Sequence, residues 1–295
     1  MHDTSEISQM ATGILRLRAA NPGPMTGSGT NTYLLHGGAG AVVIDPGPNL
    51  GSHLRAVLQA LGDVPLCAIL ITHAHLDHTA LTPALVTATK ARVLAFGGAQ
   101  SGRSARMQTL ADQGMTGGEG ADVAFRPDQV LTHGQTLRLA GLRINVIHTP
   151  GHMGGHLCFG VGDTLFSGDH VMAWSTSLVS PPEGDMAAYM ASLARLTAGD
   201  WARFLPGHGD PVGNPAARLT ALITHRRGRE ASILAALRET PATPDDLARR
   251  LYTDSPPALL PAASRNILAH LIDLHDRNLV ATTGSITANA LFHPI

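Results

Sequence analysis

Three histidines and one aspartate lie within the short segment 72–78, which reads THAHLDH. Imidazole and carboxylate groups are metal ligands that suit Zn²⁺, Mn²⁺ and Fe²⁺. The alternate residues His73 and His75 can face one ion, while Asp77 and His78 can face another. A histidine-rich surface turn is the alternative interpretation. The spacing favours a site for two divalent metal ions, because further candidate ligands follow along the chain.

Three later sequences place a histidine or an aspartate just after a short apolar run. TPGH ends at His152, SGD ends at Asp169, and PGHG contains His208. Each includes a glycine, which lets the backbone turn tightly and approach its neighbours closely. Any one of these sequences alone indicates only a turn. Together with THAHLDH, they predict a complete ligand set for two metal ions.

Short strands are expected to bring these side chains to one place. The apolar run 67–71 directly precedes THAHLDH, and runs at 142–147, 164–167 and 203–206 precede the three later sequences. Side chains that follow strand ends gather at one edge of a sheet, where α/β proteins hold their ligands.

Helical and strand-like patterns alternate over the rest of the first 215 residues, with a hairpin at 33–44, helices at 50–61, 80–89 and 186–196, and a strand at 92–96. This alternation predicts layered structure of strands and helices. The glycine-rich segment 97–120 is expected to be a loop with a helix across 104–113, and the sequence leaves open whether it is a lid.

A second domain is expected after about residue 220. The segment 216–237 has a helical pattern, which fits one helix or two, and Thr243-Pro244 begins a second helix. An apolar stripe predicts a further helix over 260–278, and β-like pieces follow at 279–282 and 285–287. Three helices followed by a small hairpin are typical of a winged helix. We therefore predict domains at 1–220 and 221–295.

Composition sets limits on the class of protein. Of the 295 residues, 44% are hydrophobic and 15% are charged, which excludes a disordered chain. The 21 Lys+Arg balance 22 Asp+Glu, so no overall charge points to nucleic acid. Cys67 and Cys158 lie in apolar runs and are predicted to be buried free thiols in a reducing compartment. Met1–Gln9 lacks the apolar core of a signal peptide and no run is long enough to cross a membrane, so a cytoplasmic location is expected.

These motifs, with Asp45 in IDPG, resemble the metallo-β-lactamase superfamily over roughly residues 30–210. The resemblance implies an α+β fold, a four-layer αββα sandwich followed here by the small winged helix. It also implies seven ligands: His73, His75 and His152 for the first metal, Asp77, His78 and His208 for the second, and Asp169 bridging both. Asp45 would be a buried acid that braces the ligand loop. His148 and His156 match no ligand position and are interpreted as neighbours of the site or as surface residues.

One branch of this superfamily is favoured. Five histidines and two aspartates resemble glyoxalase II and ribonuclease-like members. The sequences NPGPMT and GTNTYL within 21–34, YMASL at 189–193 and HRRGRE at 225–230 resemble the lactamase-β-like-2 group, whose members carry a C-terminal winged helix. That group includes an animal mitochondrial endoribonuclease and bacterial proteins labelled hydroxyacylglutathione hydrolase. The segment 171–185 differs from the animal pattern, and we expect it to shape the substrate pocket.

The predicted function is hydrolysis by two divalent metal ions, with Zn²⁺ expected and Fe or Mn as alternatives. Two cations that share a water would lower its pKa to about 7 and so supply a hydroxide that could attack the substrate. Asp77 would orient this nucleophile and take its proton. The expected substrate is a small thioester, ester or lactone.

Two other functions stay open. The arginine run 226–238 could contact phosphates of single-stranded RNA in a metal-dependent endoribonuclease, or it could be a solvated helix face. Alternatively, the winged helix could bind nucleic acid beside a vestigial enzyme domain, with 260–278 as the recognition helix. That helix has no net charge, because Arg265 and Arg277 balance Asp273 and Asp276. A homodimer is a further open arrangement.

Overall fold

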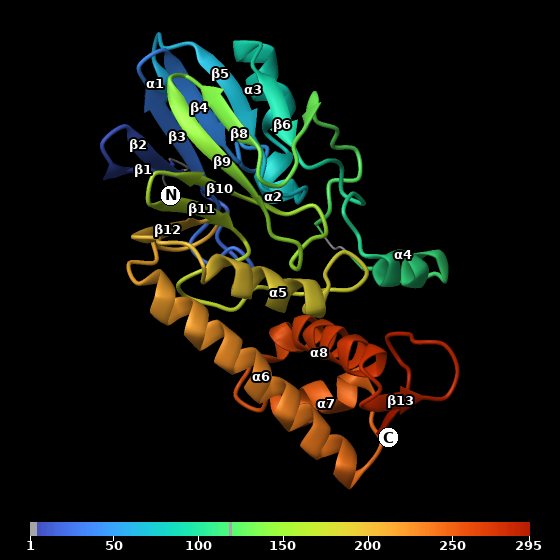
Figure 1. The fold of residues 1–295 in the computed structure, drawn as a ribbon. Coiled ribbons are helices and arrows are strands. Elements are labelled where there is room, and N and C mark those ends of the chain that lie inside the picture. The colour runs from blue at the N-terminus through green and yellow to red at the C-terminus, as the bar shows by residue number, and fades with distance from the viewer. Residues whose placement is uncertain (1–4, 118–119) are drawn as a thin grey trace.

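Two β-sheets pack face to face with helices on their outer sides in the computed structural model, which describes residues 5–117 and 120–295 (Figure 1). The first sheet holds, in spatial order, β1 (Glu6–Ala11), β2 (Ile14–Arg18), β3 (Asn31–Gly37), β4 (Gly40–Ile44), β5 (Leu66–Leu70), β6 (Arg92–Ala95) and β7 (Gln129–Val130). Strands β1 to β4 are antiparallel, and β4 to β7 are parallel.

Alternation along the central strands places apolar side chains on both faces of this sheet. Val42 and Leu70 face the second sheet, whereas Val43 and Ile69 face the outer helices. Those outer helices are α1 (Gly51–Leu61) and α3 (Thr82–Thr89), and the short α2 (Leu76–Thr79) lies between β5 and α3. Strand β5 is therefore an apolar run with buried side chains on both faces of the sheet.

The second sheet has the order β12 (Arg203–Pro206), β11 (Thr164–Gly168), β10 (Leu157–Val161), β9 (Leu142–His148) and β8 (Thr136–Leu139). Strands β11 and β12 are parallel, and the other neighbours are antiparallel. Helix α5 (Met186–Leu196) covers its outer face, where Tyr189 and Leu193 pack in one cluster with Cys158 and Phe204. These layers confirm the predicted αββα sandwich.

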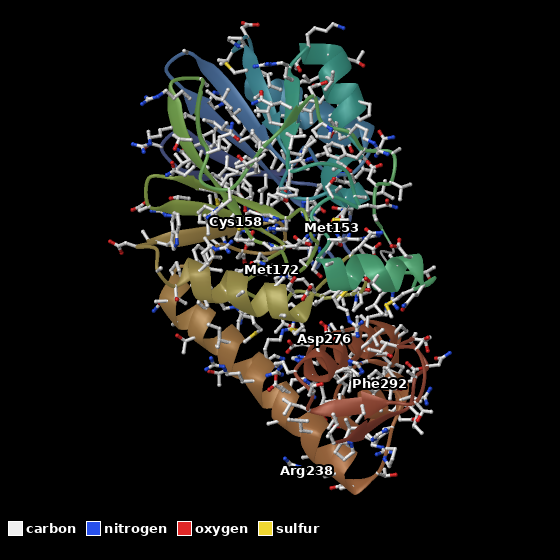
Figure 2. All side chains as sticks on the ribbon, turned by 45° about the vertical axis from the view of Figure 1, so that its right-hand side comes forward. Met153, Cys158, Met172, Arg238, Asp276 and Phe292 are labelled. Atoms are coloured by element: carbon white, nitrogen blue, oxygen red, sulfur yellow. The ribbon has the colours of Figure 1, made fainter. Side chains whose placement is uncertain are left out.

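The C-terminal elements have an apolar core of their own. They are α6 (Pro215–Glu239), α7 (Pro244–Leu251), the 3₁₀ turn η1 (Pro257–Leu259), α8 (Leu260–Asp276), β13 (Val280–Thr282) and β14 (Phe292–Pro294). Ile233, Leu247, Leu268 and Phe292 are fully or almost fully buried in this core. Figure 2 shows Phe292 here, well separated from Cys158 in the sandwich. Thr243 forms the capping box that starts α7, as its sequence predicts.

Helix α4 (Ala105–Asp112) links the glycine-rich segment to the C-terminal elements. Its Met107 and Leu110 are buried within the C-terminal core, and Arg106 pairs with Asp276 at 3.0 Å. The helix predicted at 104–113 is thus confirmed, and it packs against the C-terminal core. Gly118 and Glu119 of this segment, and Met1–Thr4 of the N-terminal segment, lie outside the described residues.

Some expectations need correction. The piece 285–287 is not a strand; β13 pairs with β14, because Phe292 is fully buried and its backbone also pairs with Ala242. Cys67 is only partly buried, since it lies at the start of β5 beside the turn between β3 and β4, although both cysteines are free as predicted. Strands β1 and β2 were not anticipated.

The helix predicted over 216–237 is a single continuous helix, α6, which runs through the predicted boundary at 220. That boundary stays a prediction. Among the described residues, no helix combines the length and apolar character needed to cross a bilayer.

Candidate metal centre

Four turns at strand ends bring all seven predicted ligands together. The turn after β5 carries the 72–78 segment, and the turns after β9, β11 and β12 carry His152, Asp169 and His208. The ligand-type atoms form three overlapping groups of three, each with all atoms within 4.8 Å of one another. The gathering of strand ends at one edge of each sheet, expected from sequence, explains this convergence.

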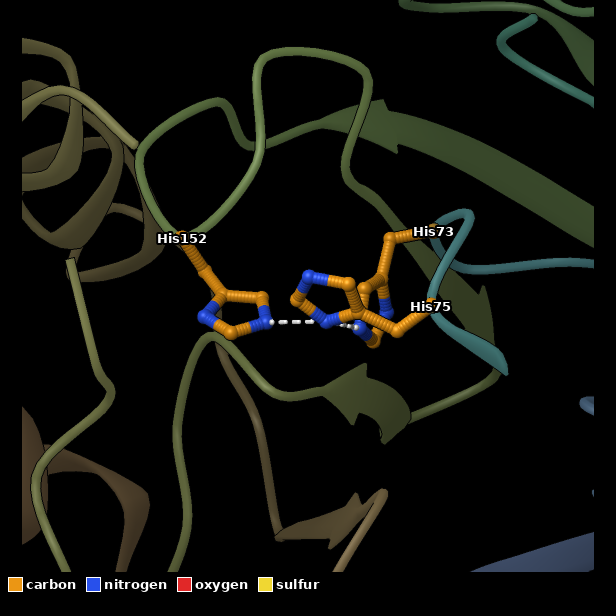
Figure 3. Close-up of side chains that lie close together, drawn as sticks. All are labelled: His73, His75 and His152. Atoms are coloured by element: carbon orange, nitrogen blue, oxygen red, sulfur yellow. Dashed lines mark hydrogen bonds between the residues drawn. The ribbon is translucent and has the colours of Figure 1, made fainter. Parts of the chain in front are cut away.

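The first group consists of His73, His75 and His152, which point toward one another (Figure 3). His75 Nδ1 lies 3.0 Å from His73 Nε2 and 3.1 Å from His152 Nε2. On the far side of each ring, His152 Nδ1 donates to the carbonyl oxygen of Leu178 at 2.7 Å, and His73 Nδ1 contacts Thr72 Oγ1 at 3.0 Å. The carbonyl can only accept, so neutral His152 directs the lone pair of Nε2 into the group.

The second group consists of Asp77, His78 and His208. His208 Nε2 lies 3.2 Å from Asp77 Oδ2 and 3.4 Å from His78 Nε2. Asp169 stands between the two groups, with Oδ2 3.3 Å from His208 Nε2 and 3.7 Å from His152 Nε2. This is the geometry of a carboxylate that could serve both metal positions.

Asp45 lies behind the second group and joins it to the first. It accepts hydrogen bonds from Thr72 N at 2.8 Å and Thr72 Oγ1 at 2.6 Å, and His78 Nδ1 donates to it at 2.9 Å. The backbone of Asp45 is in the left-handed region, with φ 52°, which is uncommon for a residue other than glycine. The predicted bracing contact therefore exists, and it fixes which nitrogen of His78 faces the centre.

The two groups differ electrostatically. Burial, assisted by the neighbouring His152, lowers the pKa of His75 to about 3. Burial also lowers the pKa of His78, but the carboxylates of Asp77, Asp169 and Asp45 outweigh it and raise that pKa to about 9. Burial opposes ionisation of Asp77, yet His78 and His208 hold its pKa well below the usual range. The first group is a set of neutral donors, and the second attracts positive charge.

These residues fit divalent cations on the evidence of the structure itself. His73 Nε2 and His152 Nε2 both direct lone pairs at His75 Nδ1, which can donate to only one of them, and Asp169 Oδ1 is buried with no hydrogen-bond partner among the described residues. An unpaired buried imidazole nitrogen and an unpaired buried carboxylate oxygen are costly unless a cation lies between them. Imidazole nitrogens with carboxylate oxygens are a donor set suited to Zn²⁺, Fe²⁺ or Mn²⁺.

Two further histidines lie buried beneath the ligands. Asp169 N donates to His156 Nε2 at 3.2 Å, and the His156 ring lies 5.2 Å from that of His73. His156 is thus a neighbour of the site, not a surface residue. His148 is half-buried and stacks on Phe96 at 4.2 Å. His170 is fully buried next to His156, which nothing in its local sequence indicates.

A cavity of about 480 Å³ opens onto both groups. Its apolar lining from the sandwich comprises Pro24, Met25, Leu76, Met172, Trp174 and Leu178, and that from the C-terminal elements comprises Tyr252, Leu259, Ala262 and Ala263. No lysine or arginine of the described ranges lines it. The expectation that 171–185 shapes the pocket is confirmed. A second cavity, of about 430 Å³, adjoins it at His75 and His152 and includes Arg265 and Glu183.

An αββα sandwich with histidines and aspartates clustered at its strand ends defines a metal-dependent hydrolase. Residues 25–208 match the family model of the metallo-beta-lactamase superfamily, and residues 243–288 match that of the beta-lactamase associated winged helix domain. The chain belongs to the metallo-beta-lactamase superfamily and carries this winged helix at its C-terminal end. The predicted family and fold are confirmed.

The chain is similar to several known proteins. A beta-lactamase-like protein 2 homolog of Drosophila melanogaster is 31% identical over 280 residues, which cover 91% of this chain and 89% of that protein. The lactamase-like protein nscB of Trichophyton rubrum is 30% identical over 239 residues, covering 79% of this chain and 65% of that protein. A beta-lactamase domain protein from Burkholderia ambifaria shares the fold, with a TM-score of 0.81 at 22% identity over 98% of this chain and 94% of that one.

Proposed function

We propose that this protein is a dinuclear hydrolase that cleaves a thioester, ester or lactone in a small, largely apolar substrate. Zn²⁺ is the proposed metal, with Fe or Mn as alternatives. The observation that carries the proposal is a ligand cluster that opens into an apolar cavity of about 480 Å³. A cavity of that size and character suits a small molecule, with polar groups at one end to orient it.

The ligand roles are assigned by position. His73, His75 and His152 would hold one cation, Asp77, His78 and His208 the other, and Asp169 would bridge them. When bound, two such ions supply an activated water and polarise the bond to be cleaved. Trp174 and Leu178 of the sandwich and Ala263 of α8 line the cavity and would contact the acyl part of the substrate.

Asp77 is the proposed catalytic residue. Its side chain lines the cavity and is 28% exposed. That fraction is larger than those of His78, His208 and Asp169. Thr30 Oγ1 donates to Asp77 Oδ2 at 3.1 Å, which fixes the direction of the carboxylate. Because the carboxylate is ionised, it can accept a hydrogen bond from the attacking water and orient it.

The arrangement of the arginines argues against RNA as the substrate. Arg226 is only 1% exposed, and Arg229 stacks on Tyr252 at 3.9 Å and donates to the carbonyl oxygen of Leu251. Arg238 lies at the end of α6 farthest from the sandwich (Figure 2). The run therefore does not line the ligand cluster with cations. The vestigial-enzyme alternative is opposed by the complete set of converging ligands.

The test combines metal content with substrate turnover. Purified protein is analysed for bound metal and assayed with an acylglutathione thioester, a lactone and a labelled single-stranded RNA. His75→Ala removes a proposed ligand, and His133→Ala replaces an exposed histidine as the control. Two metals per chain and acyl hydrolysis lost only in His75→Ala support the proposal. RNA cleavage without acyl turnover, or a protein with less than one metal and no turnover, contradicts it.

A further inference from the structure

Arg226 of α6 is a fully buried cation that points at the turn preceding α5, not at solvent. Its Nη2 donates to the carbonyl oxygen of Ser177, and its Nη1 donates to Asn266 Oδ1 on α8 at 3.2 Å. The same Asn266 oxygen accepts a hydrogen bond from Val179 N at 3.0 Å. One arginine and one asparagine from the C-terminal helices thus hold the backbone at residues 177 and 179.

The residue between these two held positions supports a proposed metal ligand. The carbonyl oxygen of Leu178 accepts the hydrogen bond from His152 Nδ1 at 2.7 Å, and Ser177 Oγ also donates to it at 3.4 Å. The position of that carbonyl decides the tautomer and the ring orientation of His152. A displacement of Leu178 would therefore turn His152 Nε2 away from the first group.

A second set of contacts leads from Arg226 to the bridging carboxylate. The guanidinium lies 5.1 Å from the ring centroid of Tyr189, a cation–π arrangement. Tyr189 Oη donates to the carbonyl oxygen of His170 at 3.2 Å, directly after Asp169 in the chain. Arg226 therefore supports, through short chains of contacts, the segments that carry both His152 and Asp169.

We infer that Arg226, with Asn266, is a positioning residue through which the C-terminal helices orient His152 and Asp169 in the metal centre. The inference rests on the ligand roles proposed above. It makes the winged-helix part a structural component of the metal site and not only a wall of the cavity.

The test measures metal binding directly, without substrate. Metal-free protein is titrated with CoCl₂, and the visible absorption of bound Co²⁺ gives both affinity and ligand geometry. We expect Arg226→Met to weaken one Co²⁺ site by roughly 10-fold and to change its absorption bands, as loss of a residue behind a ligand does. Arg226→Lys keeps the charge and a donor, so it should retain part of the affinity.

Arg229→Met is the matched control. Arg229 lies on the same helix and makes a part-buried hydrogen bond to Leu251 and a ring contact with Tyr252, neither of which is a proposed ligand. It should lower Tm while leaving the Co²⁺ affinity and spectrum unchanged, which separates loss of stability from loss of positioning.

The outcomes are distinguishable. Folded Arg226→Met that binds Co²⁺ with wild-type affinity and spectrum overturns the inference alone. If Arg226→Met fails to fold, Asn266→Ala carries the test, because it frees Val179 N and one arm of Arg226; wild-type Co²⁺ binding by that variant likewise overturns the inference. A wild-type protein that binds no Co²⁺ contradicts the proposed function and this inference with it.

Discussion

The two halves of the metal centre differ in charge. Burial lowers the pKa of His73 and of His75, so the first group offers neutral rings. In the second group, burial lowers the pKa of His208, but Asp169 and Asp77 outweigh it and hold the pKa well above its ordinary value. Without a cation the second group retains protons instead. Binding of a metal ion at this proposed position would displace those protons, and this would couple occupancy to the hydrogen bonds that orient the rings.

Asp45 is a side chain that sets this orientation for His78. Replacing it by asparagine keeps one acceptor oxygen and sets an NH₂ group against the N–H and O–H donors of Thr72 and His78. We expect Asp45→Asn to cost about 2 kcal/mol of the free energy of unfolding, because buried donors lose a charged partner. Co²⁺ affinity should also fall by roughly 10-fold. Urea unfolding and a Co²⁺ titration measure the two effects.

Asp63→Asn is the control for this change, since Asp63 is exposed on the turn before β5. It should alter neither quantity. Wild-type stability together with wild-type Co²⁺ affinity in Asp45→Asn would show that the carboxylate does not brace the ligand segment.

The turns that carry the ligands are packed too closely for most side chains. A Cβ added to Gly207 would lie 2.3 Å from Asp169 Oδ1 and 2.7 Å from His78 Cε1. Gly207→Ala must therefore displace a proposed ligand of each metal. We expect it to abolish binding of at least one of two Co²⁺ ions per chain. Gly213→Ala, on the next turn, meets nothing within 4 Å and should bind both. Equal Co²⁺ stoichiometry in the two variants would contradict this interpretation.

The convergence of the candidate ligands could be predicted because few residue types bind transition metals, and those types cluster in short motifs after apolar runs. Their supports could not. Leu178 orients His152 through a backbone carbonyl, a group that every residue has, so its sequence carries no signal. Arg226 has the same local sequence whether it faces solvent or the interior. Its burial depends on contacts with Ser177 and Asn266, 49 and 40 residues away.

Among the helices and strands, too, features with a local sequence signal could be predicted and features that depend on distant contacts could not. Periodicity predicted α1, α5 and α8, because a buried helical face repeats locally. The predicted pairing in the last hairpin was wrong. The segments 285–287 and 292–294 are both short β-like pieces, and the burial of Phe292 against distant helices decides which of them pairs with β13. Local pattern sets the type of element, and tertiary burial decides between candidates.

Helix α8 carries a histidine whose burial affects stability. His270 is 1% exposed, and its ring nitrogens have no hydrogen-bond partner among the described residues. Burial, with Arg226, Arg229, His225 and Arg277 adding positive charge nearby, lowers its pKa from 6.5 to about 3. The unfolded chain therefore takes up this proton below pH 6.5 while the folded chain does not. The contribution of His270 to stability is therefore full above that pH and falls by roughly 1 kcal/mol per pH unit as the pH drops toward 3.

His270→Leu should reduce this slope. Leucine takes up no proton and has no nitrogen that could be left unpaired. We therefore expect this variant to be more stable than the wild-type protein at pH 5. Urea unfolding at pH 7, 6 and 5 measures the slope. His133→Leu, at an exposed position, is the control and should keep the wild-type slope. An unchanged slope in His270→Leu would show that another group governs acid sensitivity.

The sandwich and the C-terminal elements are joined by more than the start of α6. Helix α8 supplies Ala262, Ala263 and Asn266 to the cavity wall, so the cavity is complete only when both parts are in place. Conversely, α4 belongs to the part of the chain that forms the sandwich, but its Met107 and Leu110 are buried in the C-terminal core. These reciprocal contacts imply that the two parts unfold together.

Met107 tests that implication, because it belongs to the part of the chain that forms the sandwich but is buried in the C-terminal core, with 2% exposed. We expect Met107→Ala to lower the free energy of unfolding by about 2–4 kcal/mol, through lost apolar burial and the cavity that remains. Trp174 and Trp201 report on the sandwich, whereas helical circular dichroism reports on both parts together. Both transitions should shift equally and coincide.

Gln108→Ala is the control, since Gln108 is exposed on the same helix, and it should shift neither transition. A shift confined to the circular dichroism would mean that the parts unfold independently.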